Sequence, residues 1–336
     1  METVTKTKTE EMLKVENLTK KFLIKKQKMP WQKKKYVHVL NGINFSINEG
    51  EALGLVGESG CGKSTTAKLI MDIYSPTTGS IKYNSTELTG LKGKEKKDIR
   101  KDIQYVFQDP MGALNPRIAV IEQIYEPLII HYGRKGIKGY YKKAVDLLES
   151  VGMKEAHGKM YPHQLSGGQR QRVVLARAMI LEPELLICDE PISALDVSIQ
   201  AQVVNLLMKI REEKGITLLF ISHDLSMVRH LCDRTAVMYM GNIVEFADRE
   251  TLFNNPLHPY TKSLINAIPI PDPRIKREET ILEGEIPSLL NPPSGCRFHP
   301  RCPVAMPECS IREPELKILS DGRQAACLAL EEGVIL

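Results

Sequence analysis

The chain has 336 residues, of which 42% are apolar and 26% charged, and its net charge is +5 at pH 7. These proportions are typical of an ordinary soluble protein and exclude a disordered or fibrous chain. No apolar run reaches the roughly eighteen residues that span a bilayer, and the start lacks the apolar stretch of a secretory signal, so we expect a cytoplasmic protein.

The positive charge is concentrated near the N-terminus, where residues 1–35 contain eleven lysines against four glutamates. A basic insert at residues 24–38 could contact nucleic acid or anionic lipid. The alternative is a solvated loop near a membrane or a partner. We adopt the second interpretation and expect no nucleic-acid partner.

The first 85 residues predict strands at 13–19, 43–48, 51–57 and 80–84, separated by glycine and asparagine turns. The third strand runs into "GESGCGKST", and residues 62–74 then have helical composition. A glycine-rich loop between a strand and a helix is the setting in which proteins bind nucleotide phosphates.

This phosphate loop, residues 57–64, fits the pattern G-x-x-x-x-G-K-S. Its glycines let successive backbone N–H groups turn toward the β- and γ-phosphates, beside the positive end of a helix. Lys63 supplies the cation, and the Ser64 hydroxyl ligates Mg²⁺. The alternative is a simple glycine turn, which the strand and helix on either side disfavour. The predicted nucleotide contacts are Gly57, Glu58, Ser59, Gly60, Cys61, Gly62, Lys63, Ser64 and Thr65.

Helical patterns dominate residues 117–182, and an apolar run at 184–190 then predicts a strand buried on both faces. That strand would deliver Asp189 to its carboxyl end, where the carboxylate can hold Mg²⁺. Glu190 follows directly and could orient or deprotonate the attacking water.

A helix at 198–215 and two strands, at 216–224 and 234–241, complete an alternating pattern that predicts a mostly parallel α/β sheet. From about Asp248 the chain becomes rich in proline, which resists regular structure. We therefore place a boundary near residues 248–255.

A second glycine loop, "LSGGQ" at residues 165–169, contains no lysine. Gly167 and Gly168 still expose backbone N–H groups where a helix is predicted to begin, with Ser166 as its N-cap. This signature loop is a weaker anion site than the first, or else a helix cap and nothing more.

Together, these two loops and "LLICDE" closely resemble the nucleotide-binding subunit of ABC transporters, from residue 13 to about 248. The resemblance implies a P-loop NTPase (RecA-like) α/β core with an antiparallel β subdomain and a helical signature subdomain at about 115–182. In that family two subunits dimerise head to tail, and each signature loop contacts the γ-phosphate held by the other subunit. ATP thereby joins the dimer, and hydrolysis releases it. We predict a nucleotide-binding domain at 13–250 and an extension at 251–336.

The resemblance also assigns residues outside the loops. Gln108 in "VFQDP" corresponds to a glutamine that senses Mg²⁺ and water, and Asp196 in "SALD" lies at the dimer seam. His223 in "ISHD" corresponds to a histidine that reaches the γ-phosphate, although a core or capping histidine is the alternative. The catalytic set is thus Lys63, Gln108, Glu190 and His223. The Mg²⁺ ligands are Ser64, Gln108 and Asp189, and the signature contacts are Ser166, Gly167, Gly168 and Gln169.

An aromatic ring ahead of the phosphate loop usually stacks on adenine in this family. Phe22 in "LTKKF" is our choice, and Tyr36 is the alternative. Either ring could instead be a packed core aromatic.

The tail resembles the extension of the oligopeptide/dipeptide importer subfamily, from the tripeptide His258, Pro259 and Tyr260 through "PPSGCRFHPRCP". Two prolines here would fix the approach to a short helix, so we expect the tripeptide to have a structural role.

Four tail cysteines, spaced C-x5-C-x6-C-x17-C, are Cys296, Cys302, Cys309 and Cys327. The spacing is untypical of zinc sites, which favour C-x2-C pairs. Some members of the importer subfamily hold a [4Fe–4S] cluster at matching cysteines, and four thiolates suit one. We predict a [4Fe–4S] cluster that stabilises the fold of the extension. Zinc and unmetallated thiols are the alternatives.

These features predict the ATPase subunit of a binding-protein-dependent importer, on the cytoplasmic face of the membrane. Its partners would be two transmembrane permease subunits, a second homologous ATPase subunit and an extracytoplasmic substrate-binding protein. The substrate would be a peptide, or alternatively an oligosaccharide or a nickel complex. An ABC ATPase acting on DNA or ribosomes is a further alternative. However, the 101 residues between Ser64 and Ser166 leave no room for a coiled-coil arm, and the chain has one cassette where ribosomal relatives have two.

Overall fold

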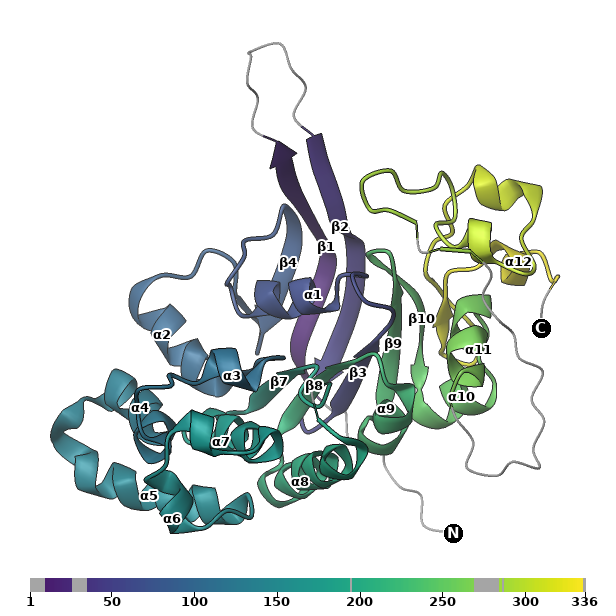
Figure 1. Ribbon diagram of the computed structural model, residues 1–336. Coiled ribbons are helices and arrows are strands. Elements are labelled where there is room, and N and C mark those ends of the chain that lie inside the picture. Colours follow the sequence, from purple (N-terminus) through teal and green to yellow (C-terminus); the bar gives the residue numbers. More distant parts are fainter. Residues whose placement is uncertain (1–9, 26–34, 194, 269–283, 286, 335–336) are drawn as a thin grey trace, which may run out of the picture. The chain divides into compact units, whose positions relative to one another are not determined.

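The computed structural model describes residues 10–25, 35–193, 195–268, 284–285 and 287–334, and within them the chain divides into two compact units (Figure 1). The helical unit comprises residues 10–13, Ser46–Ala52 and Tyr83–Ile221. The phosphate-loop unit comprises Lys14–Phe45, Leu53–Lys82 and the described residues from Ser222 onward. Most of the basic insert, and the proline-rich stretch at 269–283, lie outside the described residues.

Three parallel strands in the order β8-β7-β6 organise the helical unit. Central β7 (Leu185–Asp189) pairs with β6 (Ile103–Val106) on one side and with β8 (Thr217–Ser222) on the other. Every residue of β7 and β8 is buried, as their continuous apolar sequence predicts. The strands predicted at 184–190 and 216–224 are confirmed.

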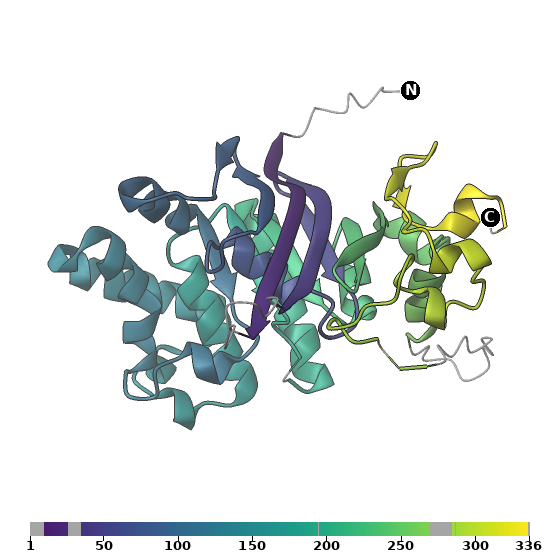
Figure 2. The ribbon, with the colours of Figure 1, turned by 90° about the horizontal axis from the view of Figure 1, so that it is seen from above.

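The helices of this unit pack around α7 (Gly167–Met179), which contacts α3, α4, α5 and α8 as well as β6. Figures 1 and 2 show α4 and α5, in teal, lying side by side. The remaining elements of the unit are β5 (Thr86–Glu87), α2 (Gly93–Asp102), α3 (Pro110–Ala113), α4 (Val120–Tyr132), η1 (Arg134–Gly136), α5 (Ile137–Ser150), α6 (Glu155–Gly158), η2 (Pro162–Gln164) and α8 (Val197–Lys214).

In the phosphate-loop unit, β3 (Ala52–Val56) pairs in parallel with β9 (Arg234–Tyr239). Strand β10 (Asn242–Asp248) then pairs antiparallel with β9. The connection at Met240 and Gly241 has positive φ at both residues, which is the geometry of a tight hairpin and explains the departure from a parallel order. A further sheet has the order β2-β1-β4, and the unit also contains the helices α1 and α9. Their bounds are β1 (Glu11–Lys25), β2 (Lys35–Asn48), α1 (Lys63–Ile70), β4 (Thr78–Tyr83) and α9 (Leu225–Leu231).

The C-terminal region, residues 249–334, contains more regular structure than its prolines predict. It adds β12 to the edge of β10 and β11 to β12, so the yellow and green segments lie side by side in Figures 1 and 2. Its elements are α10 (Arg249–Asn254), α11 (Pro259–Asn266), η3 (His299–Arg301), η4 (Pro307–Ser310), β11 (Lys317–Ile318), β12 (Gln324–Ala325) and α12 (Leu328–Glu331). Within the described ranges, we find no helix with both the length and the apolarity needed to cross a membrane.

Candidate nucleotide-binding site

The phosphate loop connects the fully buried strand β3 to helix α1. Gly57, Gly60 and Gly62 all have left-handed φ angles, of 149°, 80° and 113°, which glycine adopts without steric cost. A Cβ on Gly57 would lie 2.2 Å from the carbonyl oxygen of Met238. The loop is therefore a backbone cradle whose first glycine no other residue type can replace without moving a neighbouring strand.

Lys63 begins α1, and its side chain is 4% exposed. Its ammonium group donates to the backbone oxygens of Gly57 at 2.7 Å and Glu58 at 3.0 Å, so it lies against the inner side of its own loop. Burial raises the pKa of the Cys61 thiol even though Lys63 opposes the shift, so Cys61 is a neutral packing residue here.

In the helical unit, Asp189 ends β7 and its side chain is buried. The Tyr105 hydroxyl, from β6, donates to Asp189 Oδ2 at 2.6 Å. Burial, reinforced by the charge of Asp189, raises the pKa of Tyr105, so the phenol remains a proton donor. The sequence analysis did not identify Tyr105. Its only signal was position, because Tyr105 pairs in register with Ile187 of the strand that Asp189 ends.

Glu190 and Gln108, two of the predicted site residues, lie together in the same unit. Gln108 Nε2 donates to Glu190 Oε2 at 2.8 Å. Glu190 has a left-handed φ of 46°, unusual for a glutamate, and its N–H donates to the carbonyl oxygen of Ile221 at 2.9 Å. A non-glycine residue held in this conformation is strained, and such strain clusters at functional sites.

The signature loop forms a capping box at the start of α7. Ser166 Oγ accepts from the N–H of Gln169 at 3.3 Å, and Gln169 Oε1 accepts from the N–H of Ser166 at 2.9 Å. The loop also packs on α8, since a Cβ on Gly168 would lie 2.5 Å from Ile199 Cγ2. Asp196 caps that helix by accepting from the N–H of Ile199 at 3.0 Å, a bond that lowers the pKa of the Asp196 carboxyl.

The other predicted residues lie in the phosphate-loop unit. His223 is an exposed residue between β8 and α9. Phe22 is half-buried; it makes an edge contact with Tyr74, with 5.3 Å between ring centroids, and Lys20 Nζ lies 4.9 Å from its ring. Tyr36 is 44% exposed. The choice of adenine-stacking residue stays a prediction.

Comparison with known proteins now connects these loops to a family. A family model described as "ABC transporter" matches residues 40–193, and one described as "Oligopeptide/dipeptide transporter, C-terminal region" matches residues 244–309. The oligopeptide transport ATP-binding protein OppF of Salmonella typhimurium is 47% identical over 309 residues, which is 91% of this chain and 92% of that protein. This chain belongs to the ABC transporter ATP-binding family.

Two further relatives agree with that membership. The oligopeptide transport ATP-binding protein AppF of Bacillus subtilis is 48% identical over 294 residues, covering 87% of this chain and 89% of AppF. Among solved structures, the dimeric post-hydrolysis state of the ATP-binding cassette MJ0796, bound to ADP and phosphate, aligns with a TM-score of 0.63 at 31% identity. That alignment covers 71% of this chain and 99% of MJ0796. The chain thus has the ABC ATPase cassette fold with mixed α/β sheets, and it is an ATPase.

The ABC cassette's phosphate loop has two supports that the sequence analysis missed. The Tyr260 hydroxyl accepts from the N–H of Glu58 at 2.9 Å. The Arg301 guanidinium donates to both carboxylate oxygens of Glu58, at 2.8 and 3.0 Å. These partners lie 202 and 243 positions away from Glu58 in the chain, so no local pattern could have indicated them.

The tripeptide predicted to be structural is buried. His258 Nδ1 accepts from the N–H of Tyr260 at 3.1 Å and so caps α11, with Pro259 in the first turn. Burial lowers the pKa of His258 to about 3, so the ring is neutral at physiological pH. The buried Glu245 carboxylate accepts from the N–H groups of Leu257 at 2.8 Å and His258 at 2.9 Å.

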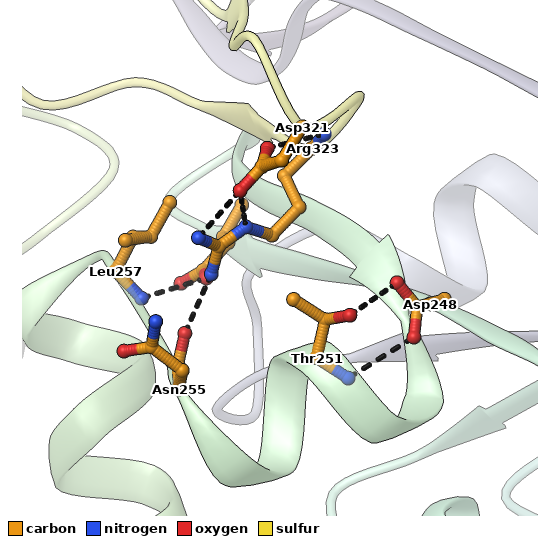
Figure 3. Close-up of polar contacts among 7 residues, drawn as sticks. Asp248, Thr251, Asn255, Leu257, Asp321 and Arg323 are labelled. Atoms are coloured by element: carbon orange, nitrogen blue, oxygen red, sulfur yellow. Dashed lines mark hydrogen bonds and ion pairs between the residues drawn. The ribbon is translucent and has the colours of Figure 1, made fainter.

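Figure 3 shows how two parts of the C-terminal region, the turn that carries Arg323 and the end of α10, are joined. Arg323 donates to Asp321 Oδ2 at 2.7 Å and to the carbonyl oxygen of Asn255, also at 2.7 Å. Asp248 caps α10 by accepting from the N–H of Thr251 at 3.0 Å. These bonds fix the turn around Arg323 and both ends of α10.

The predicted iron–sulfur site receives no support from the arrangement of the four cysteines. Among the described residues, no group of three or more histidine, cysteine, aspartate or glutamate side chains is placed to hold a metal ion. Burial, with a smaller contribution from neighbouring cysteines, raises the pKa of Cys296 and of Cys302 to about 11. As placed, the four thiols do not form a site for a single ion.

Proposed function

We propose that this chain is the ATP-hydrolysing subunit of a binding-protein-dependent importer of oligopeptides or dipeptides. Support comes from the relatives named for oligopeptide transport and from the match of residues 244–309 to the C-terminal region of such transporters. The oligosaccharide and nickel alternatives receive no comparable support. The experiment is to purify the chain from membranes with its partners and to measure ATP hydrolysis in the presence of the loaded substrate-binding protein. We expect peptides to stimulate hydrolysis; stimulation by an oligosaccharide or a nickel complex alone would contradict the peptide assignment.

The proposed nucleotide chemistry assigns each motif a role. The backbone N–H groups of the phosphate loop and the Lys63 ammonium bind the phosphates. The oxygen donors of Ser64, Asp189 and Gln108 are the hard ligands that Mg²⁺ prefers, and Mg²⁺ when bound neutralises phosphate charge. Tyr105 orients the Asp189 carboxylate through its short hydrogen bond.

Glu190 is the proposed group that positions water for in-line attack on the γ-phosphate, with His223 contributing to charge stabilisation. The observation behind this assignment is the Gln108–Glu190 hydrogen bond at 2.8 Å, together with the strained backbone of Glu190. That amide holds the carboxylate in one orientation, which general-base positioning requires.

Substitution of Glu190 tests this role. Glu190→Gln still offers an oxygen to Gln108, so nucleotide affinity should be retained while turnover falls about 100-fold or more. Glu184→Gln is a matched control, because Glu184 precedes the same strand and accepts from Tyr83 at 2.6 Å. Turnover of Glu190→Gln at the rate of the control would remove Glu190 from this role.

The signature loop and Asp196 are proposed to act on a second ATPase subunit. Support comes from the dimeric MJ0796 structure and from the contact between this loop and the helix that Asp196 caps. Two such subunits would pair head to tail beneath two permease subunits on the cytoplasmic face of the membrane. Glu190→Gln should then accumulate an ATP-bound pair, visible as a shift in gel-filtration volume that ADP does not produce.

We further propose an architecture in which a cassette of residues 13–250, with a helical signature subdomain at about 115–182, is followed by the extension at 251–336. The four cysteines of the extension are the proposed ligands of a [4Fe–4S] cluster. Support is limited to the resemblance of the extension to the importer subfamily. Anaerobic purification should yield about four iron atoms per chain, lost in Cys309→Ser. Colourless protein without iron would refute the cluster.

A further inference from the structure

The second residue of the phosphate loop, Glu58, is held by the C-terminal region at two separate points. Its carboxylate receives two parallel bonds from Arg301, and its N–H is bonded to the Tyr260 hydroxyl. The Arg301 side chain is 7% exposed and that of Glu58 is 22% exposed. Two-pronged charge-assisted bonds of this kind fix both distance and orientation, and water competes poorly for a pair this buried.

Glu58 also helps to hold the lysine of the loop. Its backbone oxygen and that of Gly57 accept from Lys63 Nζ, and its carbonyl group accepts from the N–H of Cys61 at 3.3 Å. A shift of Glu58 would therefore move both the lysine and the turn that presents the backbone donors. The position of this one residue is linked to the shape of the whole cradle.

Arg301 and Tyr260 are themselves rigidly placed. The rings of Tyr239, Tyr260 and Phe298 form a cluster with centroid distances of 4.7, 5.2 and 5.4 Å, and Phe298 is 1% exposed. The Arg301 guanidinium lies 5.9 Å from the centre of the Tyr239 ring. An aromatic cluster of this size resists rotation of its members, so it provides a fixed base for both contacts with Glu58.

We propose that Arg301 and Tyr260 are positioning residues of the phosphate loop, through which the docked C-terminal region sets the affinity for nucleotide. The inference rests on the proposed nucleotide role of residues 57–64 and adds a dependence of that site on the C-terminal region.

The test is a calorimetric titration of the full-length chain with MgADP. Arg301→Gln removes the two-pronged bond and should raise the Kd for MgADP about tenfold. Arg301→Lys keeps the charge but not the two-pronged bond, so it should recover part of the lost affinity for MgADP. Glu58→Gln should weaken binding to a similar extent, and the double variant Glu58→Gln, Arg301→Gln should be no weaker than either single variant.

Arg323→Gln is the matched control. Arg323 is also a nearly buried arginine of the C-terminal region paired with a carboxylate, but its bonds go to Asp321 and to the backbone of Asn255 (Figure 3). Both arginine variants should lower the melting temperature, whereas only Arg301→Gln should weaken MgADP binding. Equal weakening by both, or additive effects at Glu58 and Arg301, would overturn the proposal. Absence of MgADP binding in the unsubstituted chain would instead refute the nucleotide site itself.

Discussion

The phosphate loop and the signature loop both present glycines ahead of a helix, yet their helices begin differently. Helix α1 starts after Gly62, whose φ is 113°, and it has no side-chain cap. Helix α7 starts after Ser166, whose side chain forms a reciprocal capping box with Gln169. A side-chain cap satisfies donors that an anion would otherwise use. The comparison supports the proposal of a primary phosphate site at α1 and a weaker, auxiliary one at α7.

The cation is the largest difference between the loops, so its removal should have the largest effect. Lys63→Ala should lower ATP turnover by about 100-fold or more, because the ammonium stabilises charge on the phosphates. Lys68→Ala, in the last turn of the same helix, is the control and should keep turnover within about twofold of the unsubstituted chain. A steady-state ATPase assay measures both. Near-equal turnover of the two variants would show that the loop does not use its lysine.

Glycine in the phosphate loop should be required for two separable reasons. Gly57→Ala meets the Met238 carbonyl oxygen at 2.2 Å, so we expect a loss of about 3 kcal/mol or more in the free energy of unfolding. Gly60→Ala meets no described atom within 4 Å and should cost only about 1 kcal/mol from its left-handed backbone. Urea unfolding of the two variants measures this difference. A smaller loss in Gly57→Ala than in Gly60→Ala would contradict the close approach.

The signature loop should respond differently at its two glycines. A Cβ on Gly168 lies 2.5 Å from Ile199, whereas one on Gly167 lies at an ordinary 3.4 Å from Leu195. Gly168→Ala should therefore lower the unfolding free energy by about 1–3 kcal/mol, and Gly167→Ala by less than about 1 kcal/mol. Melting curves in the absence of nucleotide compare them. If Gly167→Ala is the less stable variant, the packing of this loop on α8 is wrong.

The smallest expected effect concerns the cap. Ser166→Ala removes one half of the capping box and should cost about 1 kcal/mol of stability. Ser226→Ala is a comparison, since Asp224 caps its helix by accepting from the Ser226 N–H at 2.8 Å; the substitution removes only the Ser226 hydroxyl that also donates to Asp224 and leaves this backbone bond in place. Thermal unfolding measures the melting temperatures of both variants. A melting temperature of Ser166→Ala equal to or above that of Ser226→Ala would contradict the cap.

Local motifs predicted most of the strands and the two glycine loops that precede α1 and α7, because alternation and glycine turns are short-range properties. The predicted ends of the helices were less accurate. The helix predicted over 62–74 ends at Ile70, and Asp72 then adopts a φ of 49° that a helix does not allow.

Long-range pairs could not be predicted. Tyr260 and Arg301 reach Glu58 because β10, α11 and η3 fold back on the phosphate loop. No spacing of residues in the sequence indicates this contact. The tail was expected to be irregular, yet Glu245 and Arg323 organise it by bonding backbone groups that proline leaves available. The resemblance of the tail likewise predicted a [4Fe–4S] cluster, and among the described residues no group of side chains is placed to hold a metal ion.

The central claim is that each chain binds nucleotide with its own phosphate loop and uses its signature loop on a partner. The most direct measurement is MgADP titration of isolated Lys63→Ala and Gly167→Ala, paired with turnover of each in the assembled transporter. We predict that Lys63→Ala loses binding about 100-fold, and that Gly167→Ala binds normally but loses turnover. Equal loss of MgADP affinity in both isolated variants, or full turnover of assembled Gly167→Ala, would contradict the account.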